Sequence, residues 1–262
     1  MKISIITPCY NAASFIEEGI QSILDQRQQG AELELIVVDG GSRDGTVEIL
    51  QGFGDQIDVL ISEPDQGPAD AINKGFALAT GEVVAWLNAD DCYLPNCLKR
   101  VGEAFEAHPE AVFVFGHCPI VNEAGDEIRS GITRFKECFY PFSCRFTFQC
   151  INYLSQPASF YRKSAIDVAG PLRLDLKAAW DYEFFLRLWR QGKGIRISKP
   201  ALAQFCWHPG SISGQHFRRQ FQEEFDCARE DTGPWRIQTL IHFFVKWGIV
   251  GMYTLMTRKH RT

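Results

Sequence analysis

Polar side chains that could bind a divalent cation end an apolar stretch of the sequence. The run VVAWLNADD, residues 83–91, begins like a buried strand and ends with Asn88, Asp90 and Asp91. Mg²⁺ is usually held by one or two carboxylates, with phosphates and waters completing its shell. A polar turn after a strand is the alternative, because Asn and Asp are common turn formers.

Comparable side chains follow three other apolar segments, and their spacing indicates the elements that must position them. The residues are Thr7, Pro8 and Tyr10, then Asp39, then Glu63 and Asp65. Strand-like segments at 2–8, 34–39, 58–63 and 82–88 alternate with helix-like segments at 14–26, 45–53 and 68–79. This alternation predicts an α/β fold with a parallel, doubly wound sheet, whose ligands bind beyond the carboxyl ends of the strands. A shared ligand that contains a cation would explain why acids gather at that edge.

Composition narrows the classes of function. The chain has 262 residues with 45% hydrophobic content, enough for a buried core, and its formal net charge of −5 disfavours a nucleic-acid binder. Its nine cysteines show no C-x-x-C pair, so reduced thiols in the cytoplasm are expected. The apolar run before Pro8 is too short for a signal peptide, which favours the same compartment.

Four segments resemble, in this order, the motifs of the family 2 glycosyltransferases: ITPCYN, IVVDGGSRDGT, EPDQGPADAINKGFALATGEVVAWLNADD and WDYEFFLRL. The resemblance implies a GT-A fold, a Rossmann-like, mostly parallel sheet flanked by helices. It also implies inverting transfer of a sugar from a nucleotide diphosphate donor, assisted by Mn²⁺ or Mg²⁺. The implied organisation is a glycosyltransferase domain at 1–215, with a nucleotide-sugar half at 1–100 and an acceptor-side half at 101–215, and a helical extension at 216–262.

The resemblance assigns the metal site to the NADD segment and a distant histidine. Asp90 is the implied metal ligand, and Asp91 supports it or lies on the acceptor side. Asn88 replaces the first acid of the family's D-x-D signature and, with Ala89, is expected to contact the donor. His208 is expected to approach the metal or the diphosphate, and a structural histidine is the alternative.

The nucleotide is expected to lie at the ends of the first two strands. By resemblance, Asp39 accepts a hydrogen bond from the uracil N3–H, Pro8 or Tyr10 packs on the base, and Thr7 begins the loop. The alternatives are a turn acid for Asp39 and a half-buried structural aromatic for Tyr10.

Asp70 and Lys74 are four residues apart in the segment PADAINKG, and both could face the nucleotide. Lys74 would offset the phosphate charge, and the start of the helix favours an anion. A surface ion pair between the two side chains is the alternative.

An inverting transfer needs a base that removes the proton of the acceptor hydroxyl. By resemblance this base is Asp181, near the start of the helix-like segment 180–194. Trp180 stands where the family more often has an acid, and Glu183 is the second candidate. A helix N-terminal acid favoured by the helix dipole is the alternative for both.

The acceptor is expected to be a glycan or a lipid-linked saccharide. By resemblance, Gln156, Pro157 and Ser159 line the floor of the site. The segment 135–148 is rich in Phe and Cys, has no recognisable motif, and is the candidate for an acceptor-specific flap.

The segment 234–262 is the most apolar of the chain, and three residues that interrupt it, Gln238, His242 and Lys246, share one helical sector. We expect a helix over 234–261 that lies in the membrane interface, at the inner face of the plasma membrane. The residues expected at head groups and anionic lipid are Trp235, Trp247, Arg258, Lys259 and Arg261. A helix that packs on the body or on a second subunit is the alternative.

Two hypotheses of function follow. The first is a metal-dependent inverting glycosyltransferase of glycan or polysaccharide assembly. The resemblance around Asp39 implies a UDP-sugar as its donor. The second is a catalytically weak nucleotide-sugar binding or partner module, because Asn88 and Trp180 replace acids that the family usually has. A nucleotidyltransferase is disfavoured, since no glycine-rich, basic phosphate loop follows the first strand.

Overall fold

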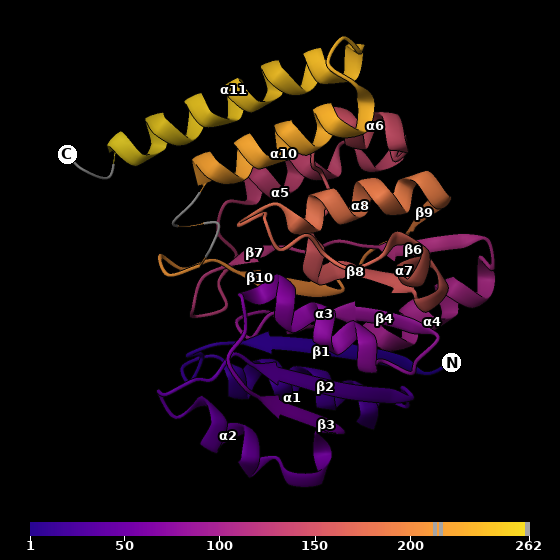
Figure 1. Ribbon diagram of the computed structural model, residues 1–262, viewed down its shortest axis with the longest axis vertical. Helices are drawn as coiled ribbons and strands as arrows, with labels where there is room; N and C mark the ends of the chain where they lie inside the picture. Colours follow the sequence, from indigo (N-terminus) through magenta and orange to yellow (C-terminus); the bar gives the residue numbers. More distant parts are fainter. Residues whose placement is uncertain (212–213, 215–216, 260–262) are drawn as a thin grey trace.

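The computed structural model describes residues 1–211, 214 and 217–259, with the side chains of 252–259 left outside the description. The expected lipid contacts of Arg258, Lys259 and Arg261 therefore lie outside the described residues. A seven-stranded sheet forms the centre of the molecule, in the order β3-β2-β1-β4-β8-β6-β9 (Figure 1). Its strands are β1 (Ile3–Cys9), β2 (Leu33–Asp39), β3 (Val59–Ser62), β4 (Val83–Trp86), β6 (Ala111–Phe115), β8 (Ser159–Arg162) and β9 (Lys193–Arg196).

The sheet is mostly parallel, which confirms the α/β fold expected from the sequence. Among themselves, the strands β1 to β4 pair only in parallel, and β9 is parallel to β6, whereas β8 is antiparallel to both of its neighbours, β4 and β6. Every residue of β1 and β2 is buried, as is typical of parallel strands that helices cover on both faces. A small sheet, in the order β5-β10-β7, joins Cys92–Tyr93, Ala203–Cys206 and Ile120–Val121.

Helices on the two faces of the sheet bury separate hydrophobic cores. Ile5 packs in one core and Ile6 in the other, because successive side chains of a strand point to opposite faces. Gly75 lets one helix approach the sheet closely, since a Cβ atom there would lie 2.4 Å from Ile6. The helices are α1 (Ile16–Gln28), α2 (Thr46–Gly52), α3 (Pro68–Leu78), α4 (Cys97–Ala107), α5 (Ser130–Glu137), α6 (Arg145–Cys150), α7 (Lys163–Ala169) and α8 (Trp180–Gln191), with short 3₁₀ helices η1 (Gly54–Gln56), η2 (Tyr140–Phe142) and η3 (Gln156–Ala158).

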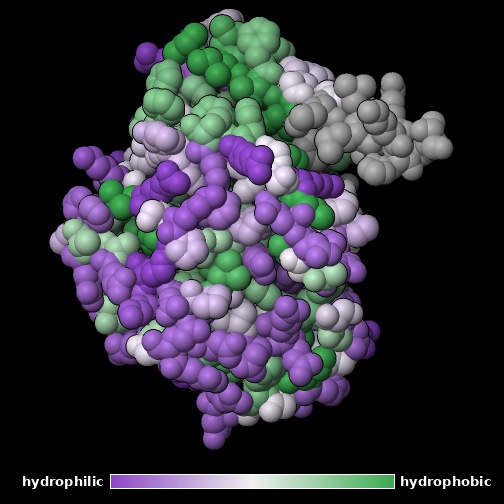
Figure 2. Space-filling view, turned by 180° about the vertical axis from the view of Figure 1, so that it is seen from behind, coloured by the Kyte–Doolittle hydropathy of each residue, from purple (hydrophilic) through white to green (hydrophobic). Residues whose placement is uncertain are grey.

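Two C-terminal helices, α10 (Phe217–Thr232) and α11 (Ile237–Lys259), form an outer layer. α10 contacts α8 and α6, and α11 contacts α10 and α6, so the pair covers the end of the molecule remote from β3 (Figure 1). Hydrophobic residues gather on that end in Figure 2. Within the described parts of the chain, no helix has the length and the apolar character that crossing a bilayer requires.

Candidate functional site

A cavity of about 1580 Å³ opens beside the carboxyl ends of β1 and β4, where the sheet topology predicts ligand binding. On the sheet side it is lined by the chain that follows β1, the turn before α3 and the NADD segment. On the opposite side it is lined by α5, the start of α8 and the inner faces of α10 and α11. The expected site residues among its lining are Pro8, Tyr10, Asn88, Ala89, Asp90, Gln156, Pro157, Asp181 and His208.

Asp90 and His208 lie together at this cavity although 118 residues separate them. His208 Nε2 is 3.1 Å from Asp90 Oδ2, and Phe15 stacks on the imidazole with ring centroids 4.7 Å apart. Neutral imidazole and carboxylate are both ligands for divalent metals. Among the residues that the structure describes, no three His, Cys, Asp or Glu side chains are grouped so that they could hold a metal ion by themselves. Asp90 and His208 therefore suit a metal whose remaining ligands come from phosphates and water.

Asp91 is fully buried and holds the NADD segment against β10. Its carboxylate accepts hydrogen bonds from Asn88 Nδ2, at 3.1 Å, and from the backbone N–H of Cys206, at 3.0 Å. Burial, reinforced by the charge of Asp90, raises the pKa of Asp91 well above its usual range. An acid at position 88 would place a further negative charge beside this carboxyl group, whereas the amide of Asn88 donates a hydrogen bond to it.

Asp181 reaches the cavity from the first turn of α8. Its Oδ1 accepts the backbone N–H of Tyr182 at 2.7 Å. Burial raises the pKa of Asp181, although this hydrogen bond and the charge of Lys136 act in the opposite direction. A carboxylate with a raised pKa is a stronger base, as a proton acceptor requires. Glu183 instead pairs with Arg187, with 2.8 Å between Oε2 and Nη2, and is not among the residues that line the cavity.

Asp39, which was expected to bind the uracil base, lies beneath the loop that follows β2. The side chain is fully buried, and its Oδ2 accepts hydrogen bonds from the N–H groups of Gly41 and Ser42, both at 3.0 Å, and from Ser62 Oγ at 2.7 Å. Burial acts to raise the pKa of Asp39, but these hydrogen bonds outweigh it and the pKa is lowered. The neighbouring Gly40 lines the cavity, so Asp39 fixes the loop there, and its contact with a base stays a prediction.

Of the other residues expected to bind the nucleotide, some line the cavity and others lie in the surrounding structure. The ring of Tyr10 is 65% exposed at the cavity, so it is accessible for stacking and is not a half-buried structural aromatic. Thr7 is buried within β1. Lys74 Nζ is 2.7 Å from Glu63 Oε1 and 3.9 Å from Asp70 Oδ2, and this hydrogen bond to Glu63 raises the pKa of Lys74. Neither Asp70 nor Lys74 lines the cavity, and their contact with the donor stays a prediction.

The fold and this site can be set beside known proteins. The family described as "Glycosyl transferase family 2" matches residues 4–169. The PGL/p-HBAD biosynthesis glycosyltransferase of Mycobacterium bovis is 32% identical over 210 residues, which cover 78% of this chain and 73% of that relative. The chain belongs to glycosyl transferase family 2. An uncharacterized glycosyltransferase of Nostoc sp. is 38% identical over 125 residues, and this family 2 chain spans 38% of its length.

Solved structures share the fold of this family 2 chain. S. aureus TarS 1-349, in complex with UDP-GlcNAc, has a TM-score of 0.70 at 21% identity, over 88% of this chain and 66% of that one. The mannosyltransferase PcManGT from Pyrobaculum calidifontis, in complex with GDP-Man and Mn²⁺, has a TM-score of 0.66 at 21% identity, over 91% and 68% of the two chains. At this identity the likeness shows the fold. The residues matched by the family end before Asp181 and His208, which the structure brings to the cavity.

Several charged residues of this family 2 chain that carry no sequence motif face the same cavity, and two of them lie near Asp181. Lys136 of α5 and Glu224 of α10 line it near Asp181. Burial lowers the pKa of Lys136. Burial raises the pKa of Glu224 to about 7, although Asn152 donates a hydrogen bond to Oε1 at 3.1 Å. These groups extend the polar part of the site toward the C-terminal helices.

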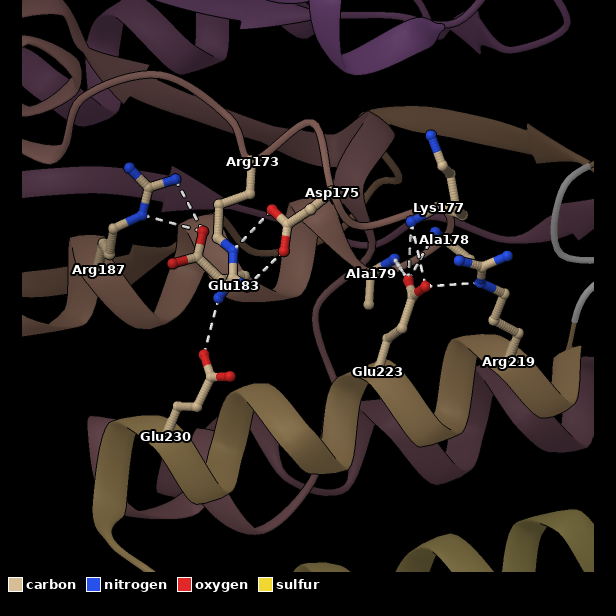
Figure 3. Close-up of polar contacts among 10 residues, drawn as sticks. All are labelled: Arg173, Asp175, Lys177, Ala178, Ala179, Glu183, Arg187, Arg219, Glu223 and Glu230. Carbon is tan, nitrogen blue, oxygen red and sulfur yellow. Dashed lines mark hydrogen bonds and ion pairs between the residues drawn. The ribbon is translucent and has the colours of Figure 1, made fainter.

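Glu223, beside Glu224 on α10, holds the backbone that leads into α8 (Figure 3). Its Oε2 accepts the N–H groups of Lys177, Ala178 and Ala179 at 3.0, 2.9 and 3.2 Å. This segment ends two residues before Asp181, so α10 helps to position the candidate base. No sequence motif marks Glu223, because its partners are backbone groups more than forty residues away.

Two of the three residues expected at the floor of the acceptor site line the cavity, and their contact with an acceptor stays a prediction. Gln156 Nε2 donates a hydrogen bond to Trp86 O at 2.7 Å, and both Gln156 and Pro157 line the cavity. Ser159 bonds to Ser155 O at 2.9 Å and does not line the cavity. Part of the expected flap, 135–148, does line it, through Phe135, Lys136 and Tyr140 among others.

Proposed function

We propose that this family 2 chain transfers a sugar from a nucleotide diphosphate donor, most simply a UDP-sugar, to a glycan or lipid-linked saccharide with inversion at the sugar. The observation that carries the proposal is that Asp90, His208 and Asp181 face one cavity from three separate parts of the chain. The UDP-GlcNAc bound to TarS and the GDP-Man bound to PcManGT support a nucleotide-sugar donor on this fold.

The proposed donor lies between Tyr10 and the NADD segment, with Mn²⁺ or Mg²⁺ held by Asp90 and His208. Mn²⁺ is present in the PcManGT complex. When bound, such a metal neutralises the charge that develops on the departing diphosphate. Tyr10 supplies an exposed ring for stacking on the base. Asn88 holds Asp91 and so keeps Asp90 directed at the cavity.

The proposed acceptor binds on the opposite side of the cavity, where Asp181 removes the proton from its hydroxyl group. The raised pKa of Asp181 favours this proton transfer. The transferase domain would comprise 1–215, and 216–262 would be an extension that completes the acceptor side through α10 and α11. We place the reaction in the cytoplasm, at the inner face of the plasma membrane.

A nucleotide-sugar binding or partner module of a glycan-assembly complex is the second candidate. Trp180 favours it, because an apolar ring lines the cavity next to Asp181, where the family more often has an acid.

Release of nucleoside diphosphate from a panel of nucleotide sugars, with Mn²⁺, Mg²⁺ or chelator, tests the proposal. We expect metal-dependent release from one donor, and its loss in Asp90→Ala. A protein that binds a nucleotide sugar but releases nothing with any acceptor glycan would favour the binding module. A protein that binds neither UDP nor GDP in the presence of metal would contradict both candidates.

A further inference from the structure

In the part of α11 from Ile237 to Gly251, polar side chains face inward and most of the large apolar side chains face outward. His242 is 3% and Lys246 8% exposed. His242 Nδ1 lies 3.0 Å from Gln149 O, and Lys246 Nζ lies 2.8 Å from Gln222 Oε1. The polar sector that contains His242 and Lys246 therefore attaches α11 to the body, and the exposed side chains from Ile237 to Gly251 are apolar.

The outward surface of α11 concentrates large hydrophobic side chains. Of the fifteen exposed large hydrophobic residues in the described chain, seven lie in a stretch of thirteen residues. We call these seven the apolar ridge: Trp235, Ile237, Leu240, Ile241, Phe243, Phe244 and Trp247. Their spacing puts most of them on one side of a helix. Figure 2 shows the hydrophobic residues gathered on this end of the molecule. A large exposed hydrophobic patch usually marks an interaction site.

The sequence around the apolar ridge has the charge that an anionic membrane surface would attract. From residue 233 to residue 262 there are five Lys and Arg residues, of which Lys246 is turned inward, and no Asp or Glu, although the formal net charge of the whole chain is −5. Aromatic side chains with nearby basic residues are typical of helices that lie in the lipid interface.

The inner side of the same helix borders the candidate acceptor site. Val245, Lys246 and Ile249 line the cavity that contains Asp181. A bilayer in contact with the apolar ridge would thus lie one helix away from the site. That arrangement suits an acceptor with a lipid anchor and gives no comparable reason for a second copy of the chain at this surface.

We propose that the apolar ridge of α11 binds the surface of an anionic lipid bilayer, with the helix lying in the plane of the interface. The inference names the partner of the proposed transferase, and rests on the proposed function only for the identity of the acceptor. Binding to vesicles is measured without catalysis, so its failure would leave the proposal of sugar transfer untouched.

The test is flotation of the full chain with vesicles of phosphatidylglycerol and phosphatidylcholine in equal parts, or of phosphatidylcholine alone. We expect binding to the anionic vesicles, at least ten-fold weaker binding to the neutral ones, and an at least ten-fold loss in the double variant Phe244→Glu, Trp247→Glu. Trp235→Glu, at a side chain that is 96% exposed and precedes the helix, is the second variant should the double variant fold poorly. Val168→Glu on α7, at a side chain 75% exposed, is the matched control and should bind like the wild type.

Several results would overturn the proposal. They are a folded wild type that binds neither kind of vesicle, equal binding of the wild type to both kinds, and variants that bind the anionic vesicles as well as the wild type does. A dimer in solution that Trp235→Glu or the double variant dissociates would assign the apolar ridge to a second copy.

Discussion

Replacement of Glu223 by alanine should loosen the start of α8 and with it the candidate base. The carboxylate accepts three backbone N–H groups at 2.9 to 3.2 Å and pairs with Arg219 at 2.8 Å. A hydrogen bond to a charged group contributes about 1.5–3 kcal/mol, and a part-buried carboxylate loses some of this to water. We expect Glu223→Ala to lower the free energy of unfolding by about 2–3 kcal/mol. Because Asp181 follows this segment, kcat should fall by about ten-fold.

The assay is urea unfolding together with the rate of nucleoside diphosphate release. Glu230→Ala is the control on the same helix, because Glu230 forms an ion pair with Arg173 and its side chain is 60% exposed (Figure 3). Glu230→Ala should lower the free energy of unfolding by less than about 1 kcal/mol and leave kcat unaltered. The lowered pKa of Glu223 means that its contribution is present above the ordinary Glu pKa of 4.5 and is lost as the pH falls through the folded pKa. Equal unfolding free energies and equal rates for the two variants would refute the reasoning.

Three further changes test other parts of the structure. Asn88→Asp should lower the free energy of unfolding at pH 7 by about 1–3 kcal/mol, because it leaves buried Asp91 without its amide donor and adds a like charge. Urea unfolding measures this change, and an unaltered free energy of unfolding would contradict the importance of the contact. Gly75→Ala should lower the free energy of unfolding by about 1–3 kcal/mol in the same measurement, because its Cβ would clash with Ile6. An unaltered urea midpoint would contradict the close approach of Gly75 to Ile6. Glu224→Gln should remove a loss of stability that the wild type shows between pH 4.5 and about 7, since burial raises the pKa of Glu224 and the native state holds its proton more tightly. Parallel pH profiles of the two proteins would contradict that assignment.

The pattern of hydrophobic residues predicts the sheet well because each strand and helix is a local feature of the chain. VVAWLN and ELIVVD alternate with amphipathic segments, and only a parallel sheet with helices on both faces buries all of them. The adjacency of Asp90 and His208 agrees with their expected common role. That expectation came from the resemblance, because the two residues are too far apart in the sequence for a local pattern to connect them.

The rest of the site could not be predicted because it depends on how distant elements pack. Lys136 and Glu224 carry no motif and reach the cavity only through the placement of α5 and α10. The shared sector of His242 and Lys246 was evident from the sequence, yet a helical period does not tell which sector faces the body. For α11 the polar sector is inside, which reverses the usual arrangement of a surface helix.

The most direct test of the central claim compares Asp181→Asn with the wild type, using the donor that the wild type cleaves. General base catalysis contributes about 10²–10⁴-fold, so sugar transfer and nucleoside diphosphate release should fall by that factor. Binding of UDP with Mn²⁺, measured by calorimetry, should be retained. Glu183→Gln should keep most of the activity, because its carboxylate pairs with Arg187 away from the cavity. Unaltered transfer in Asp181→Asn, or its loss only in Glu183→Gln, would contradict the assignment of Asp181 as the base.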